Sequence, residues 1–173
     1  MASSETGDHD IRKIGENLAN YAIDGADLKV ILDAIHPEAR INRILLEYEI
    51  KLLKIISVGW GLTFFLAENS KKEALTTAYW TAINLFSRDF SAVASTAVSK
   101  NIDYFTILKE RTNVYVSELS RNSKITDPVA VIGPKFAELC GDMENVHIVM
   151  AGNRAFSYSL KAVRDYLESI EDL

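Results

Sequence analysis

Apolar and polar residues follow their most regular pattern in the segment 38–68, and their spacing predicts one long α-helix there. Apolar residues recur three and four positions apart, as they do along one face of a helix, and a second apolar stripe runs beside the first. Charged residues crowd the first half, and none occurs between Lys54 and Glu68. The helix should therefore be amphipathic at its start, with Glu49 on its polar face, and enclosed by other helices at its end.

The remaining apolar positions also follow helical spacing. They predict two short helices near the N-terminus and further helices over 70–99, 101–121, 127–140 and 143–170. Ser70 and Glu73 have the form of a capping box, and Asp127 followed by Pro128 suits the start of a helix. Pro134 removes a backbone hydrogen bond, so its helix should kink or divide into two shorter pieces. No segment shows the two-residue alternation and turn signals of a β-hairpin.

These elements predict the fold class. The chain of 173 residues is long enough for one domain with a buried core. Residues 1–9 are polar and acidic and are expected to form a flexible N-terminal tail, and residues 10–173 a single domain. We predict an all-α fold, a single-domain helical bundle with four long helices, shorter N-terminal helices and one Pro-kinked helix.

Charge and cysteine content narrow the possible partners. The net charge is −5 and no block of Lys or Arg occurs, so nucleic acid is not an expected partner. Cys140 is the sole cysteine, which excludes an intramolecular disulfide and fits a reducing compartment. The uncharged run 55–67 is shorter than the roughly 20 residues of a membrane span, and no signal peptide is recognisable. We therefore expect a cytoplasmic protein without a membrane span.

Recognisable catalytic and metal-binding motifs are missing from the sequence. It has no phosphate-binding loop, no dinucleotide fingerprint, no nucleophile elbow and no zinc-binding spacing. Glu144 and His147 form an E-x-x-H, the spacing that places both ligands of a di-iron bundle on one helical face, but such a site needs a second motif and two further glutamates. We expect no cofactor, no metal and no enzymatic activity, and keep Glu144 with His147 as the alternative metal site.

Two features are candidates for ligand binding. Aromatic residues gather where the two longest predicted helices meet, and such clusters either line an apolar pocket or form plain core: Trp60, Phe64, Phe65, Tyr79 and Trp80. Asn153 lies on the apolar stripe of the last predicted helix. A buried asparagine needs hydrogen-bond partners, so Asn153 either fixes the packing of helices or orients a ligand.

The sequence favours a non-catalytic interaction or regulatory module that self-associates. This prediction is based on the wide apolar surface of the long helices and on the missing catalytic motifs. One chain has few helices with which to enclose the segment 55–67, so a second copy, as a homodimer, or another protein partner is expected to supply the remaining cover. The alternative is a helical bundle that binds a small apolar ligand, a cofactor or a metal, and that could be an enzyme.

Overall fold

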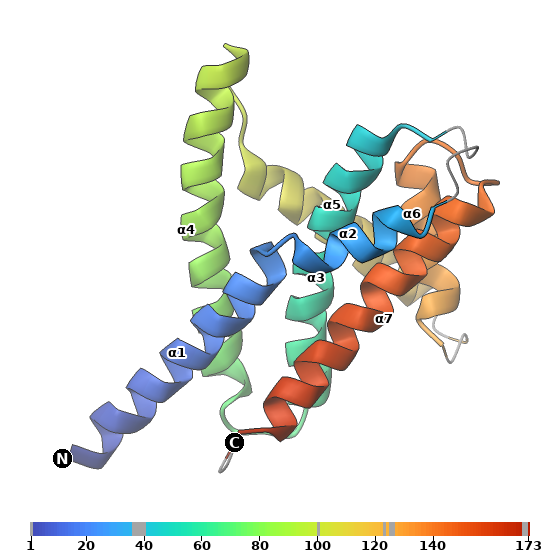
Figure 1. Cartoon of the computed structure of the whole chain (residues 1–173). Helices are drawn as coiled ribbons and strands as arrows, with labels where there is room; N and C mark the ends of the chain where they lie inside the picture. Colours follow the sequence, from blue (N-terminus) through green and yellow to red (C-terminus); the bar gives the residue numbers. More distant parts are fainter. Residues whose placement is uncertain (1, 36–40, 100, 123, 125–126, 171–172) are drawn as a thin grey trace.

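The computed structural model describes the chain except residues 1, 36–40, 100, 123, 125–126 and 171–172, and without the side chains of 2–9 and Val98. Within the described residues all regular structure is helical, which confirms the predicted all-α bundle (Figure 1). None of the described helices is long and apolar enough to cross a membrane. The helices are α1 (Ala2–Ile23), α2 (Ala26–Asp33), α3 (Arg43–Phe65), α4 (Lys72–Val98), α5 (Tyr104–Arg121), α6 (Val129–Leu139) and α7 (Val146–Glu168).

Helix α3 is the centre of the bundle. Every other helix packs against it, and Figure 1 shows it between α4 on one side and α7 on the other. Each residue from Leu52 to Gly59 is buried, so the predicted burial of the uncharged run 55–67 is confirmed for its first part. The chain's own helices supply this cover as far as Gly59, but Thr63 and Phe64 near the end of α3 are exposed, Phe64 by 57%, so the expected full enclosure of this end is wrong. A second copy that covers this end stays a prediction.

Close helix contacts depend on glycines at two crossings. A β-carbon at Gly15 of α1 would lie 2.6 Å from the β-carbon of Ala78 in α4. A β-carbon at Gly152 of α7 would lie 2.6 Å from the ring of Phe136 in α6. Real β-carbons do not approach other atoms so closely, so these two helix pairs owe their short separation to the missing side chains.

Two predicted helix starts differ from the structure, and an asparagine side chain binds a backbone amide at each. Helix α3 begins at Arg43, after Asn42 accepts a hydrogen bond from the Leu45 amide at 3.1 Å. The predicted start at residue 38 lies outside the described residues. Before α4, the Asn69 side chain accepts from the Lys71 amide at 2.8 Å, and the predicted Ser70 capping box is not the observed cap. Asparagine satisfies amides at a helix start as well as serine does.

Two further expectations about helix boundaries are corrected. Helix α1 begins at Ala2, so nearly all of the predicted N-terminal tail is helical; its flexibility stays a prediction. Helix α6 continues through Pro134 as a single helix, so a division into two pieces is wrong, while a kink stays a prediction. Pro134 is the sixth residue of α6 and has no backbone N–H. The hydrogen bond that is lost is therefore the one to a carbonyl in the first turn of the helix.

Apolar residues recur at helical spacing along the whole of α4, which predicts an inward stripe, but only those in its first half are buried. Leu75 and Tyr79 are completely buried, whereas Phe90 is 40% exposed and Val93 is 72% exposed. Figure 1 shows the C-terminal end of α4 extending beyond the other helices. The second half of α4 therefore presents apolar side chains to solvent and to the neighbouring α5.

Glu49 of α3 is buried, contrary to the prediction that it lies on the polar face. Its side chain is 1% exposed, and Arg111 of α5 binds both carboxylate oxygens: Nη2 donates to Oε1 at 2.8 Å and Nε to Oε2 at 3.0 Å. This two-pronged geometry is the strongest form of an Arg–carboxylate contact. A buried carboxylate is tolerated here because a guanidinium group neutralises it.

Lys54 is a second buried charge on α3. Its ammonium donates to the backbone oxygen of Asp24 at 2.8 Å and to the carboxylate of Asp27 at 3.2 Å. It also lies 4.1 Å from the ring centre of Tyr21, a favourable cation–π distance. These contacts tie the connection between α1 and α2 to the middle of α3.

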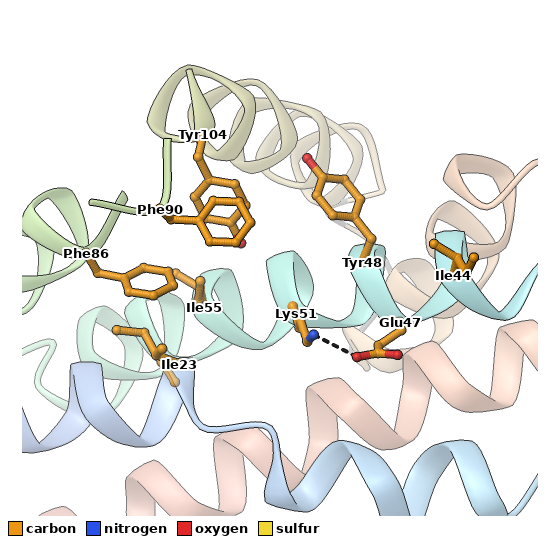
Figure 2. A pocket seen from close by; sticks show the side chains of 10 residues that line it. Ile23, Ile44, Glu47, Tyr48, Lys51, Ile55, Phe86, Phe90 and Tyr104 are labelled. Carbon is orange, nitrogen blue, oxygen red and sulfur yellow. Dashed lines mark hydrogen bonds and ion pairs between the residues drawn. The ribbon is translucent and has the colours of Figure 1, made fainter. Parts of the chain in front are cut away.

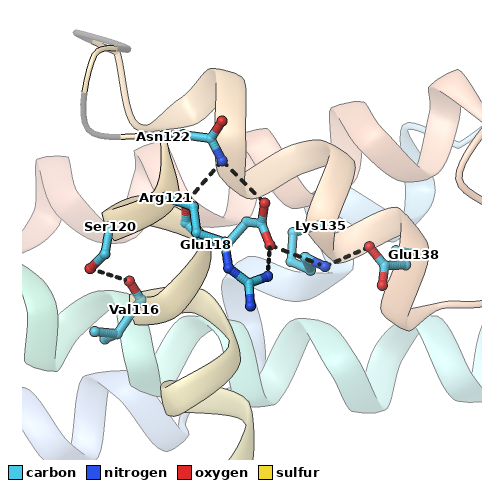
Figure 3. A network of polar contacts seen from close by, with 7 residues as sticks. All are labelled: Val116, Glu118, Ser120, Arg121, Asn122, Lys135 and Glu138. Atoms are coloured by element: carbon cyan, nitrogen blue, oxygen red, sulfur yellow. Dashed lines mark hydrogen bonds and ion pairs between the residues drawn. The ribbon is translucent and has the colours of Figure 1, made fainter.

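Helices α5 and α6 are joined by a network of ion pairs near the surface (Figure 3). The Lys135 ammonium lies 2.6 Å from Glu138 and 3.3 Å from Glu118, and Arg121 also approaches Glu118. Asn122 completes the network by donating to the backbone and carboxylate oxygens of Glu118. Each acidic group has a cationic neighbour, so the network is consistent with a structural role.

Candidate ligand-binding pocket

The aromatic residues predicted to line a pocket form two separate packing contacts. Trp60 and Phe64 stack with their ring centres 4.9 Å apart, and Trp60 also lies 5.6 Å from Phe156 of α7. Tyr79 and Trp80 meet edge to face at 5.1 Å on α4. The two contacts join α3 to different neighbours, so the predicted cluster is not a single surface.

Tyr79 and Trp80 act mainly as packing elements between α4 and α3. The Tyr79 hydroxyl donates to the backbone oxygen of Ile55 at 2.7 Å, and complete burial raises the pKa of Tyr79 well above its usual 10. The Trp80 ring covers Gly59, where a β-carbon would lie 2.5 Å away. Neither side chain borders the pocket described below, and a ligand role for these aromatic residues stays a prediction.

Asn153 lies where α6 crosses α7. Its side chain packs directly on Gly133, leaving no room for a β-carbon at that position. Its buried Oδ1 has no hydrogen-bond partner among the described residues. The contact with Gly133 favours the interpretation that Asn153 fixes helix packing, and ligand orientation by Asn153 stays a prediction.

Glu144 and His147 do not share a helical face. Helix α7 begins at Val146, with Asn145 as its cap accepting a hydrogen bond from the His147 amide at 3.2 Å, so Glu144 precedes the helix. Both side chains are exposed. Among the described residues no group of three or more His, Cys, Asp or Glu could hold a metal ion. The structure therefore gives the alternative metal site no third ligand within its described part.

A pocket of about 480 Å³ opens where α1, α3, α4 and α5 meet. Helix α1 ends at Ile23, while α4 continues past it and α5 turns back toward α3, so no further helix covers this part of α3. The volume is in the range of small-molecule sites, roughly 300–1,000 Å³. The pocket is lined by Ala22, Ile23, Ile44, Glu47, Tyr48, Lys51, Ile55, Phe86, Phe90 and Tyr104.

One end of the pocket is apolar and rich in aromatic rings (Figure 2). Phe86 and Phe90 of α4 have ring centres 6.0 Å apart, and Phe90 lies 4.8 Å from Tyr104 of α5. Ile55 of α3 and Ile23 of α1 complete this end. Because Phe90 is partly exposed, a bound apolar molecule would remove its ring from water and gain hydrophobic free energy.

The other end of the pocket carries polar groups. Lys51 donates to Glu47 at 2.7 Å, and both side chains are 46% exposed. Tyr48 points from α3 toward α5, and the Tyr104 hydroxyl points back toward α3 (Figure 2). The pKa of Tyr48 is raised mainly by burial and secondly by the negative charge of Glu49. Burial also raises that of Tyr104, so both phenols stay protonated at neutral pH and can donate.

The buried ion pair between Glu49 and Arg111 stabilises the two helices that carry Tyr48 and Tyr104. Glu49 follows Tyr48 in α3 and binds Arg111, which lies about two helical turns from Tyr104 in α5. The pair therefore fixes α5 against α3 close to the pocket.

Burial and, to a smaller extent, the charge of Glu49 raise the pKa of the Cys140 thiol to about 12, so this thiol is not a nucleophile at neutral pH.

Part of this pocket was visible in the sequence. Tyr48, Phe86 and Phe90 recur at helical spacing with other apolar residues, and that spacing predicts core positions rather than a pocket. Tyr104 carried no distinguishing signal, because it follows the predicted break between two helices. These residues form one site because α1 ends early and because α4 and α5 diverge. The periodicity of apolar residues does not predict either feature.

Comparison with known proteins does not extend this description. The chain matches no protein-family model, no curated protein and no solved structure. The geometry of the pocket therefore carries the functional argument.

Proposed function

We propose that this protein is a binding protein that holds a small, mainly apolar molecule in the pocket between α1, α3, α4 and α5. The supporting observation is the aromatic end of the pocket, where Phe86, Phe90 and Tyr104 surround a space open to solvent. Ligand pockets are typically lined by apolar and aromatic side chains with a few polar groups that orient the ligand. This pocket has that composition, whereas the described residues contain no metal-ligand cluster.

Fluorescence of an environment-sensitive dye, an anilinonaphthalene sulfonate, tests this proposal. We expect saturable binding of one dye per chain. Phe90→Ala should weaken it by about tenfold, because the lost ring corresponds to at least about 1.4 kcal/mol of apolar contact. Phe90 is 40% exposed, so its replacement should leave the fold intact.

Leu85→Ala is the matched control. Leu85 is an exposed apolar residue of the same helix but does not line the pocket, so its replacement should leave dye binding unchanged. Non-saturable dye binding, or equal loss in both variants, would contradict the proposal.

Self-association is a second candidate function, supported by the exposed end of α4. Phe90, Val93 and Ala97 follow one another at helical spacing on this end, and all three are exposed. The neighbouring residues of the segment 91–99 are mostly small, which permits a second helix to approach closely. A homodimer formed through α4 would cover this apolar face.

Light scattering coupled to gel filtration tests self-association. The expected mass is twice the 19.3 kDa of the chain, and Val93→Glu should restore the single-chain mass by placing a charge in the interface. Val30→Glu, at an exposed position of α2, is the control and should leave the dimer intact. A mass of 19.3 kDa for the unaltered protein at micromolar concentration would rule out this candidate.

A further inference from the structure

We infer that the ligand is a small amphiphile with an anionic head, most simply a carboxylate, bound by Lys51 and the Tyr104 hydroxyl. This inference rests on the proposed function and adds the chemistry of the ligand's polar end. The apolar body would occupy the space between Ile55, Phe86 and Phe90. Along α3 the pocket changes from an apolar end to a polar end. An amphiphile matches this arrangement better than a molecule that is apolar throughout.

The order of residues along α3 places the cation next to the apolar end. Lys51 lies one helical turn from Ile55, about 6 Å along the axis, and Glu47 lies one turn farther. Figure 2 shows Lys51 between Ile55 and Glu47. A ligand with its body at Ile55 therefore reaches the ammonium group before it reaches the carboxylate.

The uncommitted polar groups at this point are hydrogen-bond donors. The Tyr104 hydroxyl points into the pocket and donates to no other described residue. Lys51 uses one of its three N–H groups for Glu47. A phenol that remains protonated and an ammonium group both need an acceptor, which a ligand carboxylate supplies with two oxygens.

The acidic groups near the pocket are already engaged. Glu49 accepts both donors of Arg111, so its charge is neutralised behind the pocket. The Glu47–Lys51 pair is half-exposed and four residues apart on one helix, and such pairs are weak. Lys51 can therefore turn from Glu47 toward a ligand anion with little loss.

Three probes with the same apolar chain and different heads test the inference: decanoate, decanol and decylamine. Isothermal titration below their micelle concentrations gives the three affinities. Decanoate should bind at least about tenfold more tightly than decylamine, because a charge-assisted hydrogen bond distinguishes them. Lys51→Met keeps an apolar stem, so it should abolish the preference for decanoate while leaving decanol binding unchanged.

Two further variants complete the experiment. Tyr104→Phe should weaken decanoate binding several-fold without affecting the packing of its ring against Phe90. Glu47→Gln should strengthen decanoate binding by freeing Lys51 and removing a nearby negative charge. Lys51 and Glu47 are half-exposed, so their variants should fold, which circular dichroism would verify.

The outcomes separate this inference from the proposed function. Equal binding of the three probes would overturn the anionic head and leave the apolar pocket supported. Tighter binding of decylamine would assign the polar end to Glu47 and overturn the inference. Absence of binding for all three probes would overturn both the anionic head and the apolar pocket.

Discussion

Arg111→Met should destabilise the protein by about 3–5 kcal/mol, because it leaves a buried carboxylate without its partner. Glu49 is 1% exposed and depends on the two hydrogen bonds from Arg111 for its charge to be tolerated. Methionine retains most of the apolar stem, so the loss would report the charge and its hydrogen bonds. Urea denaturation followed by circular dichroism measures the change in the free energy of unfolding.

Two comparisons make this result specific to burial. Lys51→Met removes the cation of the half-exposed Glu47–Lys51 pair on the same helix and should change stability by less than about 0.5 kcal/mol. Adding Glu49→Met to Arg111→Met should recover much of the loss, because no charge then remains buried. If Arg111→Met proves as harmless as Lys51→Met, the Glu49 carboxylate is solvated in solution.

The central helix shows how much the sequence determines and where a simple interpretation of charge fails. Periodicity located α3 and its buried middle. Glu49 was assigned to the polar face because it is charged, although it lies four residues after Leu45 and three before Leu52. Helical spacing alone therefore places Glu49 on the apolar face. A charged residue at a core position indicates a buried partner, and identifying Arg111 as that partner required the structure.

The cover of α3 differs between its middle and its end. The predicted helices at 70–99, 101–121, 127–140 and 143–170 were counted as the available cover, and they were judged too few. In the structure the N-terminal helices α1 and α2 also pack on α3, and its middle is buried, whereas Phe64 near its end is 57% exposed. Self-association stays a prediction, and the exposed end of α4, where Val93 is 72% exposed, is a second apolar surface that favours it.

The pocket could not be predicted from the sequence, for a different reason. Its residues come from four helices, and their side chains follow the same periodicity as the core. A pocket differs from a core only in the absence of a covering element, here because α1 ends at Ile23 while α4 continues. Helix length is the least reliable part of a pattern-based prediction, since tertiary contacts decide where a helix stops.

Phe156→Ala should destabilise the protein by about 3–5 kcal/mol, the usual loss for a buried aromatic residue. Phe156 is buried where α7 packs on α3, and its ring lies 5.6 Å from that of Trp60. Truncation removes this contact and leaves a cavity beside the most enclosed helix of the bundle. Chemical denaturation should show a lower midpoint with an unchanged slope, because the surface exposed on unfolding stays nearly the same.

Tyr158→Ala is the matched control for this prediction. It truncates an aromatic residue two positions away on the same helix, but Tyr158 is exposed, so the expected loss is less than about 0.5 kcal/mol. The difference between the two variants measures the packing of α7 on α3 independently of helix propensity, which both substitutions change in the same direction. Equal losses would mean that Phe156 is not part of a tightly packed core, and the central position of α3 would then need revision.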